Sequence, residues 1–407
     1  MSHSASRNGA SILLLHFLRW LKEAADWDIE ILVDGRGPLV DEFRTLGRTR
    51  VLRNSDAVLG MLPRKWKSSL SPHLKRWCLR GLLAGRQFDL IYANTAATWP
   101  LVRALQNNSP LVWHIHELSY TLRLVITDET GSELFRQATG IIAVSSAVRD
   151  VLVREYGVSD DVVDLVYGFV PCPDLSESDR SARRRRVREA LGWGADTFVV
   201  GGCGTLGWRK GTDLFLQIAR RTCLTEGRQE VRFLWVGGEA HGPDVLEFEH
   251  DLHALGLDGR CVRVPAVANM LDYYCAMDAF ALTSREDPFP LVMLEAGALS
   301  LPVVCFAGSG GGPEFVGSGA GLIAPCQDVA AFTNHLLRLH DTPSLRHALG
   351  DGASTKVRTC YNLETQAPRL RRTVERCLHR ARAAAGSGEL RALAAPSQRR
   401  PQEHQLK

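Results

Sequence analysis

Two carboxylates near residue 290 are the side chains in this sequence whose spacing best suits chemistry on a polyol. Asp287 and Glu295 are separated by seven intervening residues in the stretch SREDPFPLVMLEA at 284–296, which follows an expected strand. A turn through Pro288 and Pro290 is expected to project Asp287 toward a ligand, and a helix over 291–298 would carry Glu295. A carboxylate accepts several hydroxyl hydrogen bonds at once. The pair therefore indicates a site for sugar or ribose hydroxyls.

A glycine-rich basic loop at 202–211, GCGTLGWRKG, is suited to a diphosphate. It lies between an expected strand at 197–202 and a helix that begins near Thr212. Glycines let a ligand approach backbone N–H groups, and a helix N-terminus favours an anion. Arg209 and Lys210 add positive charge there. The alternative is a plain glycine-rich connection with a surface basic pair. A further loop at 308–314, GSGGGPE, follows another strand and offers more bare backbone.

In the first half of the chain, polar residues follow two expected strands. His116 and Glu117 come after the strand at 111–115, and Asn94 and Thr95 follow the strand at 90–93. His114 and His116 are two residues apart, so a metal pair and a structural histidine are both alternatives. No further Cys or His stands at ligand spacing, and no Asp-x-Asp motif ends a strand. We therefore predict no metal site.

The elements that must position these residues alternate between short β-branched runs and helical stretches, which is typical of parallel sheets wrapped by helices. Because 407 residues exceed one ordinary core, we expect two domains. We predict an α/β fold of two Rossmann-like domains whose parallel sheets face each other across a deep cleft. The predicted parts are an N-terminal domain at 1–172 with an apparently truncated first strand, a linker at 173–191, a C-terminal domain at 192–365, a helix at 366–385 and a disordered tail at 386–407.

Composition is that of an ordinary globular protein, with 45% hydrophobic residues and a net charge of +4. The four arginines at 183–186 are interpreted as a helix surface, and no nucleic-acid partner is expected. Without an apolar run of about 18 residues or a signal-type N-terminus, the chain is expected in the cytoplasm. The basic segment 64–80 contains Trp66 and Trp77. It is either a peripheral contact with the inner face of an anionic membrane or a solvated helix with inward tryptophans.

The order of the basic glycine loop, the SREDPFPLVMLEA stretch and GGPE resembles the retaining glycosyltransferases of family 4 (glycosyl transferases group 1), which have the GT-B fold. The resemblance spans roughly residues 2–380 and is strongest over 198–325. It implies transfer of a hexose-type sugar from a nucleotide-diphosphate sugar to a hydroxyl of a glycan, polysaccharide or lipid-linked acceptor. Retention of anomeric configuration follows from the resemblance alone. The donor is a co-substrate, and no cofactor or metal is expected.

The resemblance implies a role for Lys210 on the donor diphosphate. Thr205 stands where the family often has Arg after the position of Gly204, and Arg209 is expected to supply that charge. Asp287 stands where most members have Glu near the transferred sugar. Glu286 is its alternative, although spacing favours Asp287.

Glu295 matches the residue that holds the donor ribose, and His116 matches a histidine beside the donor sugar. The expected catalytic set is therefore His116, Lys210 and Asp287. Asn94, Thr95 and Glu117 are expected on the acceptor side. The remaining expected donor contacts are Gly9, Pro288, Phe289, Pro290, Leu291, Gly310, Gly311 and Gly312.

Two other functions remain open from the sequence. A nucleotide-sugar epimerase on the same fold would convert the donor without any acceptor. A catalytically impaired sugar-nucleotide-binding protein would bind a nucleoside diphosphate without transfer, and the short first strand and Thr205 are the features that favour it.

Overall fold

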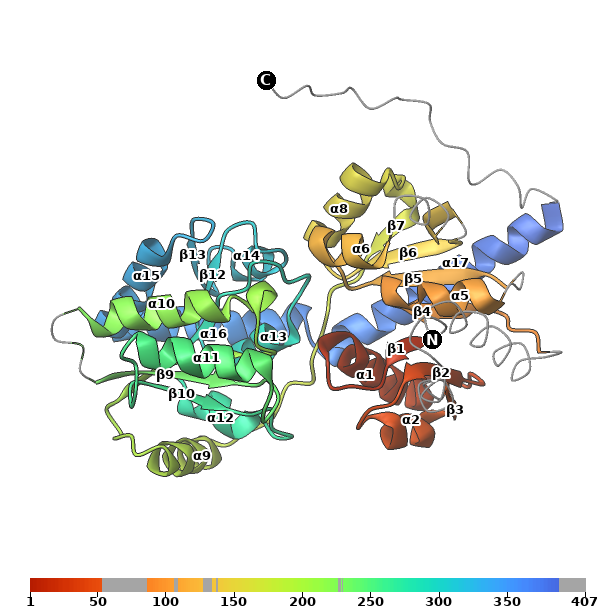
Figure 1. Cartoon of the computed structure of the whole chain (residues 1–407). Helices are drawn as coiled ribbons and strands as arrows, with labels where there is room; N and C mark the ends of the chain where they lie inside the picture. The colour runs from red at the N-terminus through yellow and green to blue at the C-terminus, as the bar shows by residue number, and fades with distance from the viewer. Residues whose placement is uncertain are drawn as a thin grey trace, which may run out of the picture.

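The computed structural model describes residues 1–52, 86–105, 109–126, 134–136, 138–225, 228 and 230–387. These residues form two α/β domains side by side, each built on one parallel sheet (Figure 1). The predicted fold class is confirmed. The basic segment 64–80 and residues 388–407 of the predicted tail lie outside the described residues.

The first sheet has seven parallel strands in the order β3-β2-β1-β4-β5-β6-β7. Several are continuous apolar runs because helices cover both faces of a parallel sheet. All four residues of β6 are buried, for example. The strands are β1 (Ser2–Ser4), β2 (Glu30–Gly35), β3 (Arg48–Val51), β4 (Ile91–Asn94), β5 (Leu111–Ile115), β6 (Gly140–Ala143) and β7 (Val163–Leu165).

The second sheet has six parallel strands in the order β10-β9-β8-β11-β12-β13. As in the first sheet, the chain reverses direction across the sheet next to its first strand, and such switch points are where open α/β sheets bind ligands. The strands are β8 (Phe198–Cys203), β9 (Val231–Val236), β10 (Cys261–Val264), β11 (Ala279–Leu282), β12 (Val303–Phe306) and β13 (Gly321–Ala324).

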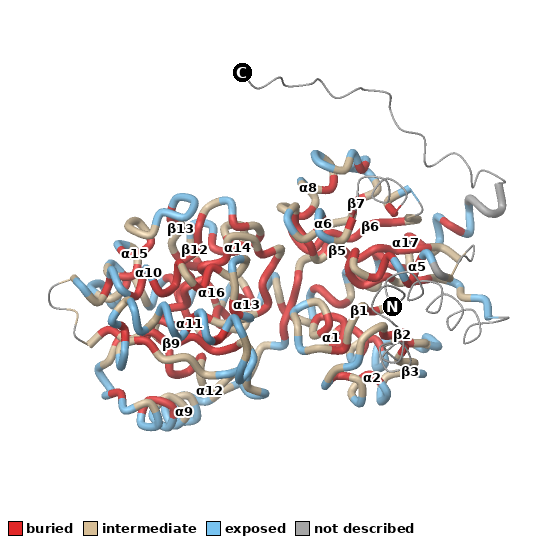
Figure 2. The backbone as a smooth tube through the Cα atoms, in the orientation of Figure 1, coloured by how far each residue is buried: buried red, intermediate tan, exposed pale blue. Residues whose placement is uncertain are grey.

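Helices cover both sheets, and their buried sides form the core together with the strands (Figure 2). Around the first sheet they are α1 (Gly9–Ala24), α2 (Val40–Leu46), α5 (Trp99–Leu105), α6 (Ser119–Val125) and α8 (Ser146–Tyr156). Around the second they are α9 (Glu177–Ala190), α10 (Thr212–Cys223), α11 (Pro243–Ala254), α12 (Leu271–Ala276), α13 (Leu291–Ala298), α14 (Gly312–Val316), α15 (Val329–Asp341) and α16 (Pro343–Cys360).

The last helix, α17 (Leu363–Ser387), returns from the second domain to the first. Near its start, Val170 and Asn362 form a backbone bridge. Further along, α17 packs on α1, and Arg376 pairs with Asp164 of β7 at 2.8 Å. The helix predicted at 366–385 therefore lies within α17 and joins the two domains a second time.

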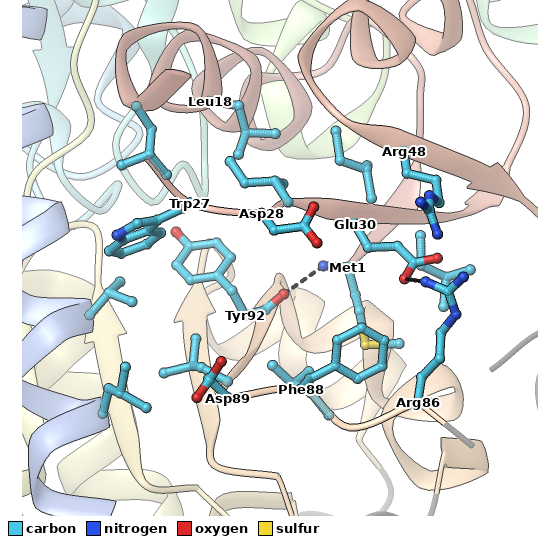
Figure 3. A pocket seen from close by; sticks show the side chains of 18 of the residues that line it. Met1, Leu18, Trp27, Asp28, Glu30, Arg48, Arg86, Phe88, Asp89 and Tyr92 are labelled. Carbon is cyan, nitrogen blue, oxygen red and sulfur yellow. Dashed lines mark hydrogen bonds and ion pairs between the residues drawn. The ribbon is translucent and has the colours of Figure 1, made fainter. Parts of the chain in front are cut away.

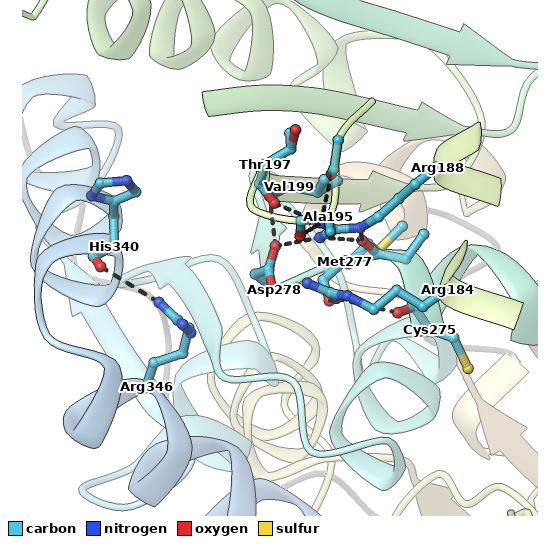
Figure 4. A network of polar contacts seen from close by, with 12 residues as sticks. Arg184, Arg188, Ala195, Thr197, Val199, Cys275, Met277, Asp278, His340 and Arg346 are labelled. Carbon is cyan, nitrogen blue, oxygen red and sulfur yellow. Dashed lines mark hydrogen bonds and ion pairs between the residues drawn. The ribbon is translucent and has the colours of Figure 1, made fainter. Parts of the chain in front are cut away.

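The predicted linker at 173–191 contains α9, which packs against α12 of the second domain. Arg188 is 2% exposed, and its guanidinium donates to the carboxylate of Asp278 and to the carbonyl oxygens of Ala276, Ala195 and Thr197 (Figure 4). In the arginine run, Arg184 also pairs with Asp278, while Arg183 and Arg186 pair with Asp272. Most of this run is therefore engaged in holding α9 on the second domain.

The first strand, β1, has three residues and pairs on both sides. Ser2 of β1 lies opposite Val33 of β2 and Asn94 of β4. At its amino end, between β2 and β4, is a pocket of about 600 Å³ (Figure 3). The Met1 ammonium donates there to the Tyr92 carbonyl at 2.6 Å, and burial lowers its pKa to about 5. This pocket faces away from the carboxyl ends of the strands, where the predicted site residues lie.

Candidate active site

The loops at the carboxyl ends of both sheets meet between the domains. Gly310, in the loop after β12, is so close to the loop after β5 that an added Cβ would lie 2.7 Å from a methyl carbon of Leu118. A Cβ on Gly9, at the start of α1, would lie 3.9 Å from Leu291 of α13. One apolar cluster, which includes Phe169 and Phe289, also spans both domains. Residues that the sequence places far apart are thus brought together.

The basic pair of the second domain faces Asp287. The Lys210 ammonium donates to Oδ2 of Asp287 at 2.5 Å, and Nη1 of Arg209 lies 3.7 Å from Oδ1. The hydroxyl of Ser284 also donates to Oδ2, at 3.1 Å. Asp287 is 5% exposed, and the Lys210 side chain is 12% exposed. A buried carboxylate therefore occupies the position next to the two cations that the sequence assigns to a diphosphate.

Backbone geometry fixes both partners of this ion pair. Gly211 has φ 63° at the start of α10, and a Cβ there would meet the Thr283 carbonyl oxygen at 2.1 Å, so only glycine fits. Asp287 donates its N–H to the Ser309 carbonyl at 2.8 Å and accepts from Gly311 N–H at 3.0 Å. The three loops predicted from sequence, at 202–211, 284–290 and 308–314, therefore form one hydrogen-bonded unit.

Glu286, the sequence alternative to Asp287, points to the other domain. Its two carboxylate oxygens each lie 3.1 Å from the backbone N–H of Tyr120, at the start of α6. Arg209 donates to the Glu286 carbonyl at 3.1 Å. Of the two acidic neighbours, the structure therefore brings the Asp287 carboxylate to the basic pair and the Glu286 carboxylate to the first domain.

A second glutamate crosses the interface in the same way. Glu314 of α14 accepts from the N–H of Ser146, at the start of α8, at 3.0 Å and from its hydroxyl at 2.6 Å. The Tyr167 hydroxyl donates to the same carboxylate. A carboxylate is stabilised at a helix N-terminus by free N–H groups and by the helix dipole. Glu286 and Glu314 therefore hold the two domains together on either side of the glycine loop at 308–312.

His116 lies at the carboxyl end of β5 and is fixed by Asn94 of β4. Asn94 donates its amide N–H to the Ala10 carbonyl at 3.1 Å, which leaves Oδ1 to accept from His116 Nε2 at 3.1 Å. Because a carbonyl only accepts, this orientation gives His116 a proton on Nε2 and a free lone pair on Nδ1. Burial lowers the pKa of His116 to about 3, so the imidazole is neutral at physiological pH.

Glu117 and Thr95 lie beside this histidine. Glu117 is buried and accepts from the N–H groups of Ala96 and His116 at 3.2 and 2.9 Å. Burial raises its pKa to about 7. Thr95 has φ 83°, a strained value for a β-branched residue, and its hydroxyl contacts His3 Nδ1 at 3.1 Å. Strain at this strand end is typical of a functional position.

The neutral state of His116 predicts a pH-dependent stability. Its folded pKa of about 3 is below the ordinary 6.5, so the unfolded chain binds the proton more readily. The stability it contributes is present above pH 6.5 and is lost as the pH falls toward 3. Between pH 6.5 and 5 the loss should be about 2 kcal/mol.

The measurement is denaturant unfolding of wild type and His116→Gln at pH 7 and pH 5, where the variant should lose less stability. The raised pKa of Glu117 acts in the opposite direction, but both proteins retain that carboxyl. His253→Gln is the control because that imidazole is on the surface beside Asp258. Equal losses in wild type and His116→Gln would contradict the prediction.

Glu295, the expected ribose ligand, lies on α13 and meets a residue that sequence did not single out. The hydroxyl of Tyr274, on α12, donates to Glu295 Oε2 at 2.7 Å. Burial raises the pKa of Glu295, and the hydrogen bond from Tyr274 opposes that rise. Tyr274 itself is 2% exposed.

The other expected donor residues line the same junction. The Lys210 side chain passes over Gly204, within 3.2 Å of where a Cβ would be, whereas Thr205 is exposed. Pro288 and Phe289 pack on Gly311, and Phe289 and Leu291 on Gly168. Gly312 begins α14.

Sequence reasoning missed four contributors: Ser284 on Asp287, Tyr274 on Glu295, and the aromatic pair Tyr120 and Trp208. The rings of that pair meet across the domains with centroids 4.9 Å apart. Trp208 lies within the predicted basic loop, and this position is the sequence feature that could have pointed to the aromatic pair. Ser284 lies three residues before Asp287 in the same stretch, whereas Tyr274 and Tyr120 meet their partners from separate segments that have no local pattern.

No group of three or more His, Cys, Asp and Glu side chains in the part of the chain that the structure describes is arranged to hold a metal ion. Within the same residues, no helix combines the length and apolarity needed to cross a membrane.

Comparison with known sequences identifies both domains. The model of "Glycosyltransferase Family 4" matches residues 7–172, and that of "Glycosyl transferases group 1" matches residues 197–342. A D-inositol 3-phosphate glycosyltransferase of Kribbella flavida is 27% identical over 262 residues, 60% of each chain. The lipopolysaccharide core biosynthesis glycosyltransferase LpsD of Rhizobium meliloti is 26% identical over 213 residues, 52% of this chain and 56% of that protein. The match thus spans a little over half the length of these relatives.

Solved structures share the whole fold. Anabaena Alr3699/HepE in complex with UDP and glucose superposes with a TM-score of 0.73 and 20% identity, over 92% of this chain and 98% of that one. WaaG, a glycosyltransferase involved in lipopolysaccharide biosynthesis, superposes with a TM-score of 0.68 and 13% identity, over 91% of this chain and 98% of that one. Two parallel sheets, matched family models over both domains and these neighbours agree: the chain belongs to the group 1, family 4 glycosyltransferases, with the GT-B fold.

Proposed function

We propose that this protein transfers a sugar from a nucleotide-diphosphate donor to the hydroxyl of a glycan or lipid-linked acceptor, with retention of anomeric configuration. The observation that carries the proposal is the group of Lys210, the partly exposed Arg209 and the buried Asp287 between the two domains. Two cations next to the start of α10 suit a diphosphate, and the adjacent carboxylate suits sugar hydroxyls.

The donor would bind mainly on the second domain. Its diphosphate would lie against Lys210, Arg209 and the N-terminus of α10, and its ribose against Glu295. As the sugar leaves, negative charge grows on the diphosphate, and fixed positive groups in a partly buried site stabilise that charge. These side chains supply the charge that a divalent ion provides elsewhere, so we infer metal-independent transfer of a hexose-type sugar.

The first domain would complete the site from the opposite side. His116 offers a neutral acceptor at Nδ1, which suits a hydrogen bond from a donor-sugar hydroxyl. Asn94, Thr95 and Glu117 surround it and would face the acceptor. The names of LpsD and WaaG, both concerned with lipopolysaccharide, support a glycan or lipid-linked acceptor.

Binding of UDP is the first expected result, since Alr3699/HepE binds UDP in its solved structure. UDP at 100 times its Kd should stabilise the folded state by about 2.7 kcal/mol. Thermal unfolding with UDP, GDP, ADP and dTDP measures this effect, and the largest increase in Tm should come from UDP. The same measurement with different sugars attached to the preferred nucleotide then identifies the donor sugar.

Transfer itself is tested with the selected donor and a set of glycan and lipid-linked acceptors, with products identified by mass spectrometry. Acceptor-dependent release of the nucleotide together with a glycosylated product supports the proposal. Conversion of the donor sugar without acceptor would indicate an epimerase instead. No increase in Tm with any of the four nucleotides would contradict donor binding.

A further inference from the structure

The contact between Tyr274 and Glu295 has no counterpart in the sequence motifs. We propose that Tyr274 determines nucleotide specificity by positioning Glu295, so that the site prefers ribonucleoside over 2′-deoxyribonucleoside diphosphates. This inference rests on the proposed function, because Glu295 is taken as the ligand of the donor ribose. Tyr274 would touch Glu295 and not the substrate, so it is a positioning residue.

The geometry allows the Tyr274 hydroxyl little choice of partner. Its ring is buried and packs against Phe280 of β11, with ring centroids 6.2 Å apart. Cys203, at the end of β8, is close enough to interact with the hydroxyl. Burial keeps the phenol protonated by raising its pKa well above the ordinary value. A protonated phenol held in this way donates to Glu295 Oε2.

That hydrogen bond sets what Glu295 can recognise. A protonated carboxyl donates a hydrogen bond through its O–H, whereas a carboxylate only accepts hydrogen bonds. Burial favours the protonated form of Glu295, and donation from Tyr274 favours the carboxylate. Among the contacts of the described residues, Oε1 receives no hydrogen bond from the protein. The ionised group is thus left with free acceptor positions for neighbouring hydroxyls, as in the 2′ and 3′ positions of ribose.

A 2′-deoxyribose leaves one of these acceptor positions without a partner. Hydrogen bonds to a charged group contribute enough that their loss weakens binding by about 10-fold or more. Sites that hydrogen-bond a hydroxyl reject ligands lacking it for this reason. A Glu295 that is misoriented or protonated would lose this discrimination.

The test compares binding of UDP and 2′-deoxy-UDP, measured by titration calorimetry, in wild type and Tyr274→Phe. Phenylalanine keeps the ring packed on Phe280 and removes only the hydroxyl. Wild type should prefer UDP by about 10-fold or more, and Tyr274→Phe should lower this preference to a few-fold. The KM for the UDP-sugar should rise while kcat stays near the wild-type value, as expected for loss of uniform binding.

Tyr273→Phe is the matched control. It removes the hydroxyl of the preceding residue in the same helix, and that hydroxyl makes no hydrogen bond within the described part of the chain. Its preference for UDP should equal that of wild type. Glu295→Gln supplies the second comparison, because adding Tyr274→Phe to it should change nucleotide binding no further.

Each outcome decides the matter. Equal preferences for UDP over 2′-deoxy-UDP in Tyr274→Phe and Tyr273→Phe would overturn the role of Tyr274 but not the proposed function. A further loss of nucleotide affinity on adding Tyr274→Phe to Glu295→Gln would have the same meaning. Failure of wild type to bind any nucleoside diphosphate would overturn the proposed function and this inference with it.

Discussion

Replacement of Lys210 by alanine should lower kcat/KM for sugar transfer by about 100- to 1000-fold. Lys210 is the cation nearest to Asp287 and would contact the departing diphosphate, where a single preorganised charged donor has an effect of this size. The measurement is initial-rate kinetics with the donor selected by thermal unfolding. Near-normal turnover in this variant would contradict the diphosphate assignment.

The Lys210→Ala variant has a structural side effect that needs its own control. It leaves Asp287 buried with only the Ser284 hydroxyl and, at 3.7 Å, Arg209. Removing one partner of a buried ion pair destabilises a protein by about 3–5 kcal/mol. The double variant Lys210→Ala/Asp287→Asn removes both charges and should recover much of the lost Tm. Because Asp287→Asn alone is expected to slow transfer, the activity of the double variant is compared with that of Asp287→Asn. A further loss at equal stability belongs to the Lys210 charge and not to unfolding.

Much of the fold was predictable because buried strands of a parallel sheet are continuous apolar runs. The expected strands at 90–93, 111–115 and 197–202 match β4, β5 and β8 to within one residue at each end. The helix expected over 291–298 matches α13. In these segments the apolar composition agrees with the buried environment in the fold, because both faces of each sheet are covered by helices.

Two edge strands were missed, and the first strand was expected only as apparently truncated, for an equally physical reason. β1 is three residues, Ser-His-Ser, and β3 reads Arg-Thr-Arg-Val at the edge of its sheet. β13, Gly-Leu-Ile-Ala, forms the other sheet's edge. Such short segments become strands because a neighbouring strand offers hydrogen bonds, and pairing of this kind leaves no period in the sequence. The apparently truncated first strand is present in the structure as β1.

In the candidate site, too, local patterns predicted individual residues but not the contacts between distant segments. Sequence selected Lys210 and Asp287, because glycine loops and strand ends mark them. It could not show that they pair, since 77 residues separate them. The contacts of Glu286 with α6 and Glu314 with α8 depend on how two domains approach each other, over separations of 166 and 168 residues. Local pattern carries no information on such contacts, so the sequence favoured Asp287 over Glu286 on spacing alone.

Replacement of Asp287 by asparagine should have opposite effects on binding and on transfer. In the unliganded protein the Asp287 carboxylate neutralises Lys210 and Arg209, so a diphosphate must compete with it for both cations. Asparagine keeps the shape and removes that competing charge. UDP should therefore bind about 5- to 30-fold more tightly, corresponding to about 1–2 kcal/mol. Transfer should nevertheless fall by about 100-fold, because the acceptor for the donor-sugar hydroxyls is weakened.

Asp213→Asn is the matched control for this prediction. Asp213 lies in the first turn of α10 beside the same basic loop, but its carboxylate pairs with Arg285 at 2.7 Å and not with Lys210. UDP affinity from calorimetry and kcat from initial rates should both stay near the wild-type values in this variant. Weaker UDP binding in Asp287→Asn would mean that the carboxylate orients Lys210 for the phosphate and does not compete with it. The sign of the change in affinity thus separates two roles that the ion pair alone leaves equivalent.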